Sequence, residues 1–228
     1  MTGDVAGERK EHPMADLTLY IANKNYSSWS MRPWIALEAA NIPFEEKLIR
    51  FDFPAGNPEI RAISPSGKVP VLEHEDLRIW ESLAIIEYAA ELHPDAGLWP
   101  EDRRDRALAR ALSMEMLGGF RALRNACPMN LRRPPRAIAL PDGVTEDVAR
   151  IETLWRERLA ASGGPFLFGR FSAADAMFAP VVNRLETYEL TADETVLAYM
   201  AAVKAHPAWR KWEAAALAEP WIVPEDEA

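Results

Sequence analysis

The sequence predicts two structural units in one chain, a mixed α/β unit followed by an all-helical unit. Short apolar, β-prone runs alternate with helical patterns as far as about residue 98. After residue 103 no strand-like run occurs, and Ala, Leu, Arg and Glu dominate. Because strands and helices leave different periodicities in a sequence, this change marks a boundary. We therefore expect domains at 16–98 and 103–228, and a disordered extension over the polar residues 1–15.

The α/β unit has the predicted order β-α-β, an irregular segment, then β-β-α. The expected elements are strands at 17–22, 44–49 and 77–80, a strand that begins near residue 71, and helices at 29–40 and 81–92. Between the second and third strands, the stretch 51–66 is broken by prolines and a glycine. It therefore has room for only a short helix.

Helical periodicity recurs throughout the second unit. The expected helices are at 102–126, 146–161, 173–186, 195–205 and 207–218, with a proline-rich loop at 132–143. Ser172 and Asp175 form a Ser-x-x-acid pattern immediately before an apolar helix, which is typical of a capping box. We interpret this pattern as structural and assign it no chemistry. The tail from 219 to 228 is expected to be loose.

Composition and charge restrict the classes of partner. The chain carries a net charge of −9, which disfavours nucleic acid and an anionic membrane surface, because both demand a basic face. No run approaches the roughly 18 apolar residues that a membrane span needs. The four histidines are scattered, so no metal site is expected. The single cysteine, Cys127, excludes a disulfide within the chain, is expected to be a buried structural thiol, and fits a cytoplasmic protein.

A serine pair precedes the first predicted helix. Ser27 and Ser28 stand where N-cap residues are found, and capping of free backbone N–H groups is their commonest role. The same position allows chemistry, because a helix N-terminus carries partial positive charge and free N–H donors. A hydroxyl there can donate a hydrogen bond to a thiolate and lower the pKa of the thiol. The chain has no cysteine at this point, so such a thiolate would belong to a bound ligand.

Two further motifs lie in the same unit. Val69-Pro70 leads into the predicted hairpin, where an ordinary trans proline is the commoner state. A cis bond would turn the Val69 backbone outward, where it could pair with a peptide ligand like an added strand. Glu81 and Ser82 open the 81–92 helix, and both residue types stabilise a first helical turn. The functional alternative is recognition of an amino-acid head group, with Ser82 at its carboxylate and Glu81 at its ammonium.

The order of these motifs within one unit resembles that of the cytosolic glutathione transferase superfamily. The stretch 27–32, Ser-Ser-Trp-Ser-Met-Arg, is similar to the zeta-class signature Ser-Ser-Cys-Ser-x-Arg and to bacterial serine-type enzymes. The resemblance spans about residues 17–220. It implies a thioredoxin-like N-terminal domain, an all-helical glutathione-transferase C-terminal domain and a homodimer. Trp29 stands where the signature has cysteine, which removes protein thiol chemistry there and argues against maleylacetoacetate isomerase activity.

The resemblance implies that glutathione is the co-substrate and that no metal takes part. The residues implied in glutathione binding are Trp29, Lys68, Val69, Pro70, Glu81 and Ser82. The γ-glutamyl group would contact Glu81 and Ser82. The cysteinyl backbone would pair with Val69 beside a cis proline, and Lys68 would reach the glycyl carboxylate. Ser27 is the first choice for the hydroxyl that stabilises the thiolate, and Ser28 is the second. The expected lining of the acceptor pocket is Met114, Met116, Phe120 and Arg124.

The expected function is that of a glutathione transferase, which activates the glutathione thiol for attack on a small electrophilic substrate. A zeta-like glutathione-dependent isomerase is one alternative. Others are a non-catalytic regulatory protein of the stringent-starvation type on the same fold, which binds RNA polymerase, and a protein that sequesters apolar ligands without turnover. The intact Ser27, Val69-Pro70 and Glu81-Ser82 set favours the enzyme, because a regulator has no need to keep a ligand site.

Overall fold

The computed structural model describes residues 16–51 and 57–227, so the extension expected over residues 1–15 lies outside the described part of the chain. Within that part, one sheet has the strand order β2-β1-β3-β4, built from β1 (Leu17–Ile21), β2 (Glu45–Leu48), β3 (Val71–His74) and β4 (Leu77–Trp80). β1 pairs in parallel with β2 and antiparallel with β3, which pairs antiparallel with β4. The parallel pair needs a crossover connection, and α1 (Ser28–Ala39) supplies it.

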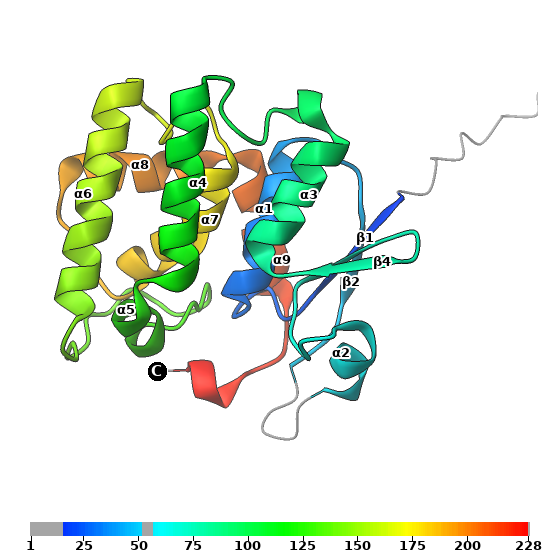
Figure 1. Cartoon of the computed structure of the whole chain (residues 1–228). Coiled ribbons are helices and arrows are strands. Elements are labelled where there is room, and N and C mark those ends of the chain that lie inside the picture. Colours follow the sequence, from blue (N-terminus) through cyan, green and yellow to red (C-terminus); the bar gives the residue numbers. More distant parts are fainter. Residues whose placement is uncertain (1–15, 52–56, 228) are drawn as a thin grey trace, which may run out of the picture.

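The sheet separates a main core from a small second core. Alternate residues of a strand point to opposite faces, and Leu19 and Ile21 of β1 are buried in the main core. α1 and α3 (Ser82–Leu92) pack on that side of the sheet. Tyr20, which points to the other face, packs on a small cluster beneath α2 (Pro58–Ile63). This short helix fits the broken stretch of sequence that leads up to β3 (Figure 1).

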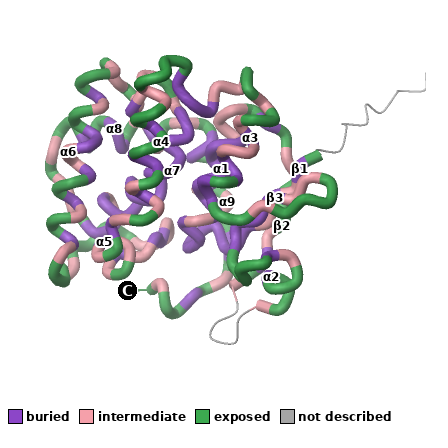
Figure 2. The backbone as a smooth tube through the Cα atoms, in the orientation of Figure 1, coloured by how far each residue is buried: buried purple, intermediate pink, exposed green. Residues whose placement is uncertain are grey.

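The helical unit is organised around one buried helix. Its elements are α4 (Arg103–Gly118), α5 (Arg121–Ala126), α6 (Val144–Ser162), α7 (Ala173–Thr187), α8 (Glu194–Ala205) and α9 (Pro207–Ala218), with short 3-10 turns η1 (Pro94–Ala96) and η2 (Pro224–Asp226) at its borders. Almost every residue of α7 is buried, and α7 packs against both α4 and α1. Figure 2 shows α1 and α7 as largely buried tubes. One hydrophobic core therefore runs through both units. The mixed sheet with its helices, followed by an all-helical unit, confirms the predicted fold class.

The capping box predicted at the start of α7 is present. The Asp175 carboxylate accepts hydrogen bonds from the backbone N–H (2.9 Å) and the hydroxyl (3.0 Å) of Ser172. It also accepts from the N–H of Leu167 and from the hydroxyl of Tyr199 of α8. A single buried carboxylate thus fixes the start of the central helix and ties it to α8.

The prediction of one continuous helix over 102–126 is wrong. α4 and α5 are separate helices, divided by Gly119 and Phe120. Phe120 has a left-handed backbone with φ of 52°. A Cβ atom on Gly119 would lie 2.7 Å from the carbonyl oxygen of Glu115, a distance that real side chains do not reach. The glycine pair at 118–119 was the available signal, because glycine is a poor helix former.

The expectation of a loose tail is also wrong. The carboxylate of Glu219 accepts hydrogen bonds from the backbone N–H groups of Lys24 (2.7 Å) and Asn25 (3.2 Å), in the turn before α1. Val223 is buried, and η2 follows it. Figure 1 shows this segment, in red, running from α9 past the N-terminal unit. The tail is ordered because it supplies an acceptor for N–H groups that are buried elsewhere in the chain.

Candidate functional site

A cleft lies between the N-terminal end of α1 and the helical unit. Its larger part, a cavity of about 350 Å³, is lined by residues 26–29 and 67–69, by Phe51, Asn57 and Ile60, by Arg124, Pro128 and Met129, by Arg184 of α7, and by Asp226 of η2. A smaller cavity of about 140 Å³ shares Trp29, Lys68 and Val69 with the first. The two cavities therefore adjoin, and together they gather the motifs predicted from three separate stretches of sequence.

The smaller cavity brings Val69-Pro70 and Glu81-Ser82 together. The Val69–Pro70 peptide bond is cis, as the resemblance implies. The Ser82 hydroxyl donates a hydrogen bond to the carbonyl oxygen of Trp29 (2.7 Å), which joins the start of α3 to the start of α1. Glu81 has a left-handed backbone with φ of 70°, an uncommon conformation for a residue other than glycine. Backbone and side-chain groups from both motifs thus border one small polar space.

The two serines at the N-terminus of α1 have different partners. The hydroxyl of Ser27 donates to the oxygen of Ser30 (2.7 Å), which also accepts from the N–H of Ala22 (3.1 Å). Ser27 makes no side-chain capping bond. The oxygen of Ser28 accepts a hydrogen bond from Nη2 of Arg184 (3.3 Å), and the described residues give its proton no acceptor. Of the two serines, Ser28 is the one whose proton is free for a ligand.

Two arginines lie over the ring of Trp29. The guanidinium carbon of Arg32 lies 4.3 Å from the centroid of its ring, and that of Arg124 lies 5.2 Å from it. Arg32 is buried and donates to the carbonyl oxygens of Met177 (2.9 Å) and Ser28 (2.9 Å). The ion pairs among the described residues involve none of Arg32, Arg124 and Arg184.

These guanidinium groups raise the positive potential of the cleft. Burial, followed by the nearby charge of Arg124, lowers the pKa of Arg184 to about 10. Burial, with Arg184 and Arg124 adding to it, lowers the pKa of Arg32 well below its usual range. Asp226 is the acidic residue that lines the larger cavity, and Glu81 lines the smaller one. Burial raises the pKa of Asp226, and Arg184 opposes that shift. Among described groups the cations thus outnumber the anions, and their charge favours a negatively charged ligand.

The four residues predicted to line an acceptor pocket lie in different environments. Arg124 lines the larger cavity. Met116 and Phe120 are buried in the main core, where the Phe120 ring lies against that of Phe178 with centroids 6.5 Å apart. Met114 is exposed on the surface of α4. The structure therefore brings Arg124 to the cleft and places the other three elsewhere in the helical unit.

Two charged residues of the cleft escaped the sequence analysis. Arg184 directly follows Asn183 in the largely apolar sequence of α7, and this polar pair next to an apolar run was a usable signal. Asp226 lies in an acidic end that follows the apolar run 221–223, and that run indicated docking without indicating that Asp226 reaches the cleft. Cys127, in contrast, is free and buried as predicted, and burial raises the pKa of its thiol to about 11.

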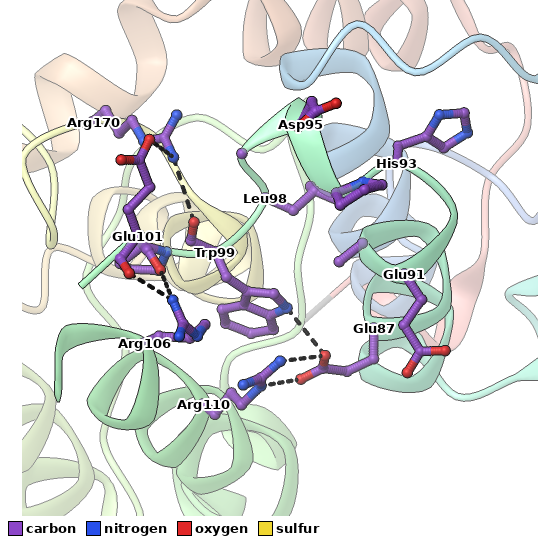
Figure 3. Close-up of a pocket in the computed structure, with 14 residues that line it drawn as sticks. Glu87, Glu91, His93, Asp95, Leu98, Trp99, Glu101, Arg106, Arg110 and Arg170 are labelled. Atoms are coloured by element: carbon purple, nitrogen blue, oxygen red, sulfur yellow. Dashed lines mark hydrogen bonds and ion pairs between the residues drawn. The ribbon is translucent and has the colours of Figure 1, made fainter. Parts of the chain in front are cut away.

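A second cavity, of about 420 Å³, lies where α3, η1 and the start of α4 meet. Figure 3 shows that several of its polar side chains, among them Glu87, Arg106 and Arg110, already have partners. The Glu87 carboxylate accepts from Nε of Arg110 (2.7 Å) and from the indole N–H of Trp99 (3.2 Å). Arg106 and Arg170 donate to backbone carbonyl oxygens of the segment that connects the two units. We interpret this cavity as part of the structural junction, because all three of its arginines already have partners.

The described residues carry neither a cluster suited to a metal ion nor a helix suited to a membrane. They contain no group of three or more His, Cys, Asp or Glu side chains arranged to hold a metal ion. Nor does a helix within 16–51 or 57–227 have the length and apolar character needed to cross a membrane.

Comparison with known proteins extends these observations. Residues 26–92 match the family model for the glutathione S-transferase N-terminal domain, and residues 107–215 match the model for the C-terminal domain. The chain is 33% identical over 177 residues to maleylacetoacetate isomerase of Mus musculus, covering 75% of this chain and 79% of that protein. It is 29% identical over 202 residues to a probable maleylacetoacetate isomerase of Caenorhabditis elegans, covering 83% and 92%.

A solved structure gives the same result at the level of the fold. The crystal structure of a glutathione transferase homolog from Sulfitobacter, with bound glutathione, superimposes with a TM-score of 0.67 at 26% identity. The superposition covers 87% of this chain and 97% of that one. Both domain models are matched in the expected order, and both flank the cleft described above. The chain therefore belongs to the glutathione S-transferase family.

Proposed function

We propose that this chain binds glutathione in the cleft and activates its thiol for attack on a small electrophilic substrate. The observation that carries the proposal is the free hydroxyl proton of Ser28, which lies at the N-terminus of α1 and lines the larger cavity. Glutathione bound to the Sulfitobacter relative supports the choice of ligand. The family match supports the class of reaction.

The smaller cavity suits the γ-glutamyl end of glutathione. Glu81 offers a carboxylate to the ammonium group, and Ser82 begins a helix whose N–H groups favour a carboxylate. Val69 precedes a cis proline, and its backbone can pair with the cysteinyl residue of the ligand. Lys68 lines both cavities and can reach the glycyl carboxylate.

Ser28 is our choice for the hydroxyl that stabilises the thiolate. Its oxygen already accepts from Arg184, so its own proton can point to the sulfur, whereas the proton of Ser27 is used by Ser30. Lowering a thiol pKa by two units takes about 2.7 kcal/mol. One charge-assisted hydrogen bond of about 1.5–3 kcal/mol and a helix dipole of about 0.3–1 kcal/mol are sufficient. The residues present therefore account for activation without a metal or a general base.

Glutathione-dependent isomerisation is the second candidate. The relatives named above as maleylacetoacetate isomerases favour it. Trp29 stands in place of the cysteine of the zeta signature, and its ring lies between two arginines. Both candidates require an activated glutathione thiol, so they share Ser28 and differ in the acceptor.

We also propose a homodimer located in the cytoplasm. Family membership supports the dimer, as do large apolar side chains exposed on β4 and α4, among them Trp80 and Met114. The single buried cysteine fits a reducing compartment. Light scattering coupled to size-exclusion chromatography is expected to give twice the chain mass of 25.6 kDa. A single-chain mass at micromolar concentration would contradict the dimer.

Calorimetric titration with glutathione tests the proposed function directly. We expect binding, and we expect Glu81→Gln to weaken it about tenfold, because the ammonium group loses a charged partner. Glu91→Gln, an exposed substitution on the same helix, is the matched control and should bind as the unmodified protein does. The glutathione complex should then conjugate 1-chloro-2,4-dinitrobenzene. Absence of binding at millimolar glutathione would contradict the proposal and favour a regulatory role on this fold.

A further inference from the structure

The larger cavity of the cleft, which Ser28 lines, carries an excess of positive charge. Lys68, Arg124 and Arg184 line it, against the single carboxylate of Asp226. The chain as a whole is acidic, with a net charge of −9. Positive charge thus exceeds negative charge in this cavity although the chain as a whole is acidic.

Arg184 is a buried cation that lacks most of its hydrogen-bond partners. Its side chain is only 4% exposed. Nη2 donates to the Ser28 oxygen at 3.3 Å, but Nε and Nη1 have no hydrogen-bond partner. Arginine is rarely buried without a partner, because removing a charge from water is costly unless an opposite charge and hydrogen bonds replace it. Asp226 shares the cavity but forms no ion pair with Arg184 among the described residues.

Arg124 approaches the same cavity from α5. Its guanidinium lies 5.2 Å from the centroid of the Trp29 ring, which fixes its orientation. Its Nε is buried and has no hydrogen-bond partner. Two elements of the helical unit, α5 and α7, therefore bring incompletely paired guanidinium groups to one space. Apolar side chains, including Phe51 and Met129, form another part of the lining.

We propose that Arg184 and Arg124 bind a carboxylate carried by the acceptor substrate, so that the acceptor is an aryl or unsaturated carboxylic acid. The proposal rests on the proposed function, and it names the substrate class of that site. Guanidinium groups match the two oxygens of a carboxylate in geometry and charge. The apolar side chains of the lining contact the aryl or unsaturated part of the acceptor. Arg184 also touches Ser28, so the carboxylate and the attacking sulfur lie on neighbouring groups.

The thiolate of glutathione does not by itself neutralise the two guanidinium groups. Ser28 already offers one proton to the sulfur, and a sulfur bound there carries a single charge for two guanidinium groups. Asp226 supplies a further test of the idea, because its carboxylate lies in the space that the substrate carboxylate would enter. Removing that like charge should strengthen the binding of a carboxylate and leave a neutral acceptor unaffected.

The experiment compares two acceptors that differ in one charge, 4-chloro-3,5-dinitrobenzoate and 4-chloro-3,5-dinitrobenzamide. In each, the sulfur–carbon bond forms, the carbon–chlorine bond breaks and chloride leaves, while the carboxylate or amide is unchanged. Each kcat/KM is divided by the rate constant of the reaction with free glutathione, which removes the difference in intrinsic reactivity. We expect a preference of about tenfold or more for the benzoate, as a charged hydrogen bond provides.

Variants then assign the preference to residues. Arg184→Gln and Arg124→Gln should each reduce the benzoate preference toward one, and Asp226→Asn should increase it. Arg150→Gln, which removes an exposed arginine of α6, is the control for net charge and should leave the preference unchanged. Binding without turnover is measured by calorimetric titration of the glutathione complex with 3,5-dinitrobenzoate and 3,5-dinitrobenzamide. The benzoate should bind more tightly, and the same variants should change the ratio in the same directions.

The outcomes separate this inference from the proposed function. If glutathione binds and both acceptors react with equal normalised rates, the carboxylate site is contradicted while the transferase function stands. If the benzoate preference persists in both arginine variants, Arg184 and Arg124 are not its source. If Arg184→Gln does not fold, Arg124→Gln and Asp226→Asn still decide, and opposite shifts in the two support the site. Failure of glutathione to bind contradicts the proposed function first.

Discussion

Arg184 donates a hydrogen bond to Ser28, is attracted by Asp226 and is repelled by Arg124. The hydrogen bond fixes the direction of a hydroxyl. The attraction by Asp226 compensates the buried charge only in part, and the repulsion by Arg124 opposes it. Proteins keep such charges where function needs them, at the expense of stability.

At the scale of single residues, the sequence predicts which serines begin the helix. It does not predict which serine keeps its proton free, because that depends on Arg184, about 156 residues away in the chain.

This balance predicts the effect of an apolar replacement. Arg184→Met removes a buried charge that lacks partners at Nε and Nη1, while it keeps most of the side-chain volume. We expect the ligand-free variant to be as stable as the unmodified protein, or more stable by up to about 4 kcal/mol. Thermal or urea unfolding measures this difference, and Arg150→Met on the exposed face of α6 is the control. A loss of more than about 3 kcal/mol would show that Arg184 is structurally essential.

Local signals predict most elements of this chain, and their failures have local causes. The capping box at Ser172 and Asp175 is read correctly because it involves residues three positions apart. The break between α4 and α5 is missed because an apolar pattern continues across it, while the deciding contact is steric. Gly119 is required where its missing Cβ would meet the carbonyl oxygen of Glu115. Periodicity reports which face is buried, but it does not report such a clash.

The two neighbouring glycines should therefore respond in opposite ways to alanine. Gly118 is the last residue of α4, and a Cβ there has no atom within 4 Å. Gly118→Ala should stabilise the protein by up to about 1 kcal/mol through helix propensity. Gly119→Ala should destabilise it by about 1–3 kcal/mol, because the Cβ would lie 2.7 Å from the Glu115 oxygen. Urea unfolding of both variants checks this, and equal effects of the same sign would refute the steric explanation.

The whole molecule is held together by contacts that no local pattern reveals. α1 packs on α7 and α9, and rings from two units meet where Trp34 lies 5.2 Å from Trp212. The C-terminal tail returns to the turn before α1 through Glu219 and brings Asp226 into the cleft. Fold class and motif order follow from the sequence and the resemblance. The closing of the cleft by a distant tail does not, because a short segment with three apolar residues gives no periodic signal of where it docks.

Glu219 offers a test of this coupling. Glu219→Ala leaves the buried N–H groups of Lys24 and Asn25 without their acceptor. We expect a loss of about 1.5–3 kcal/mol in the free energy of unfolding, since both bonds are made to a charged group. Glu225→Ala, an exposed substitution in the same tail, is the control and should change stability by less than about 0.5 kcal/mol. Equal effects of the two substitutions would contradict a specific role for Glu219.

The central claim is that Ser28, at the N-terminus of α1, ionises the thiol of bound glutathione. A pH titration of the ultraviolet thiolate absorbance of the complex tests it most directly, with Ser28→Ala and Ser27→Ala measured beside the unmodified protein. We predict that the bound thiol has a pKa at least about one unit below that of free glutathione. Ser28→Ala should abolish the shift, and Ser27→Ala should keep most of it. An unshifted thiol in the unmodified protein, or a shift that survives Ser28→Ala, would contradict the claim.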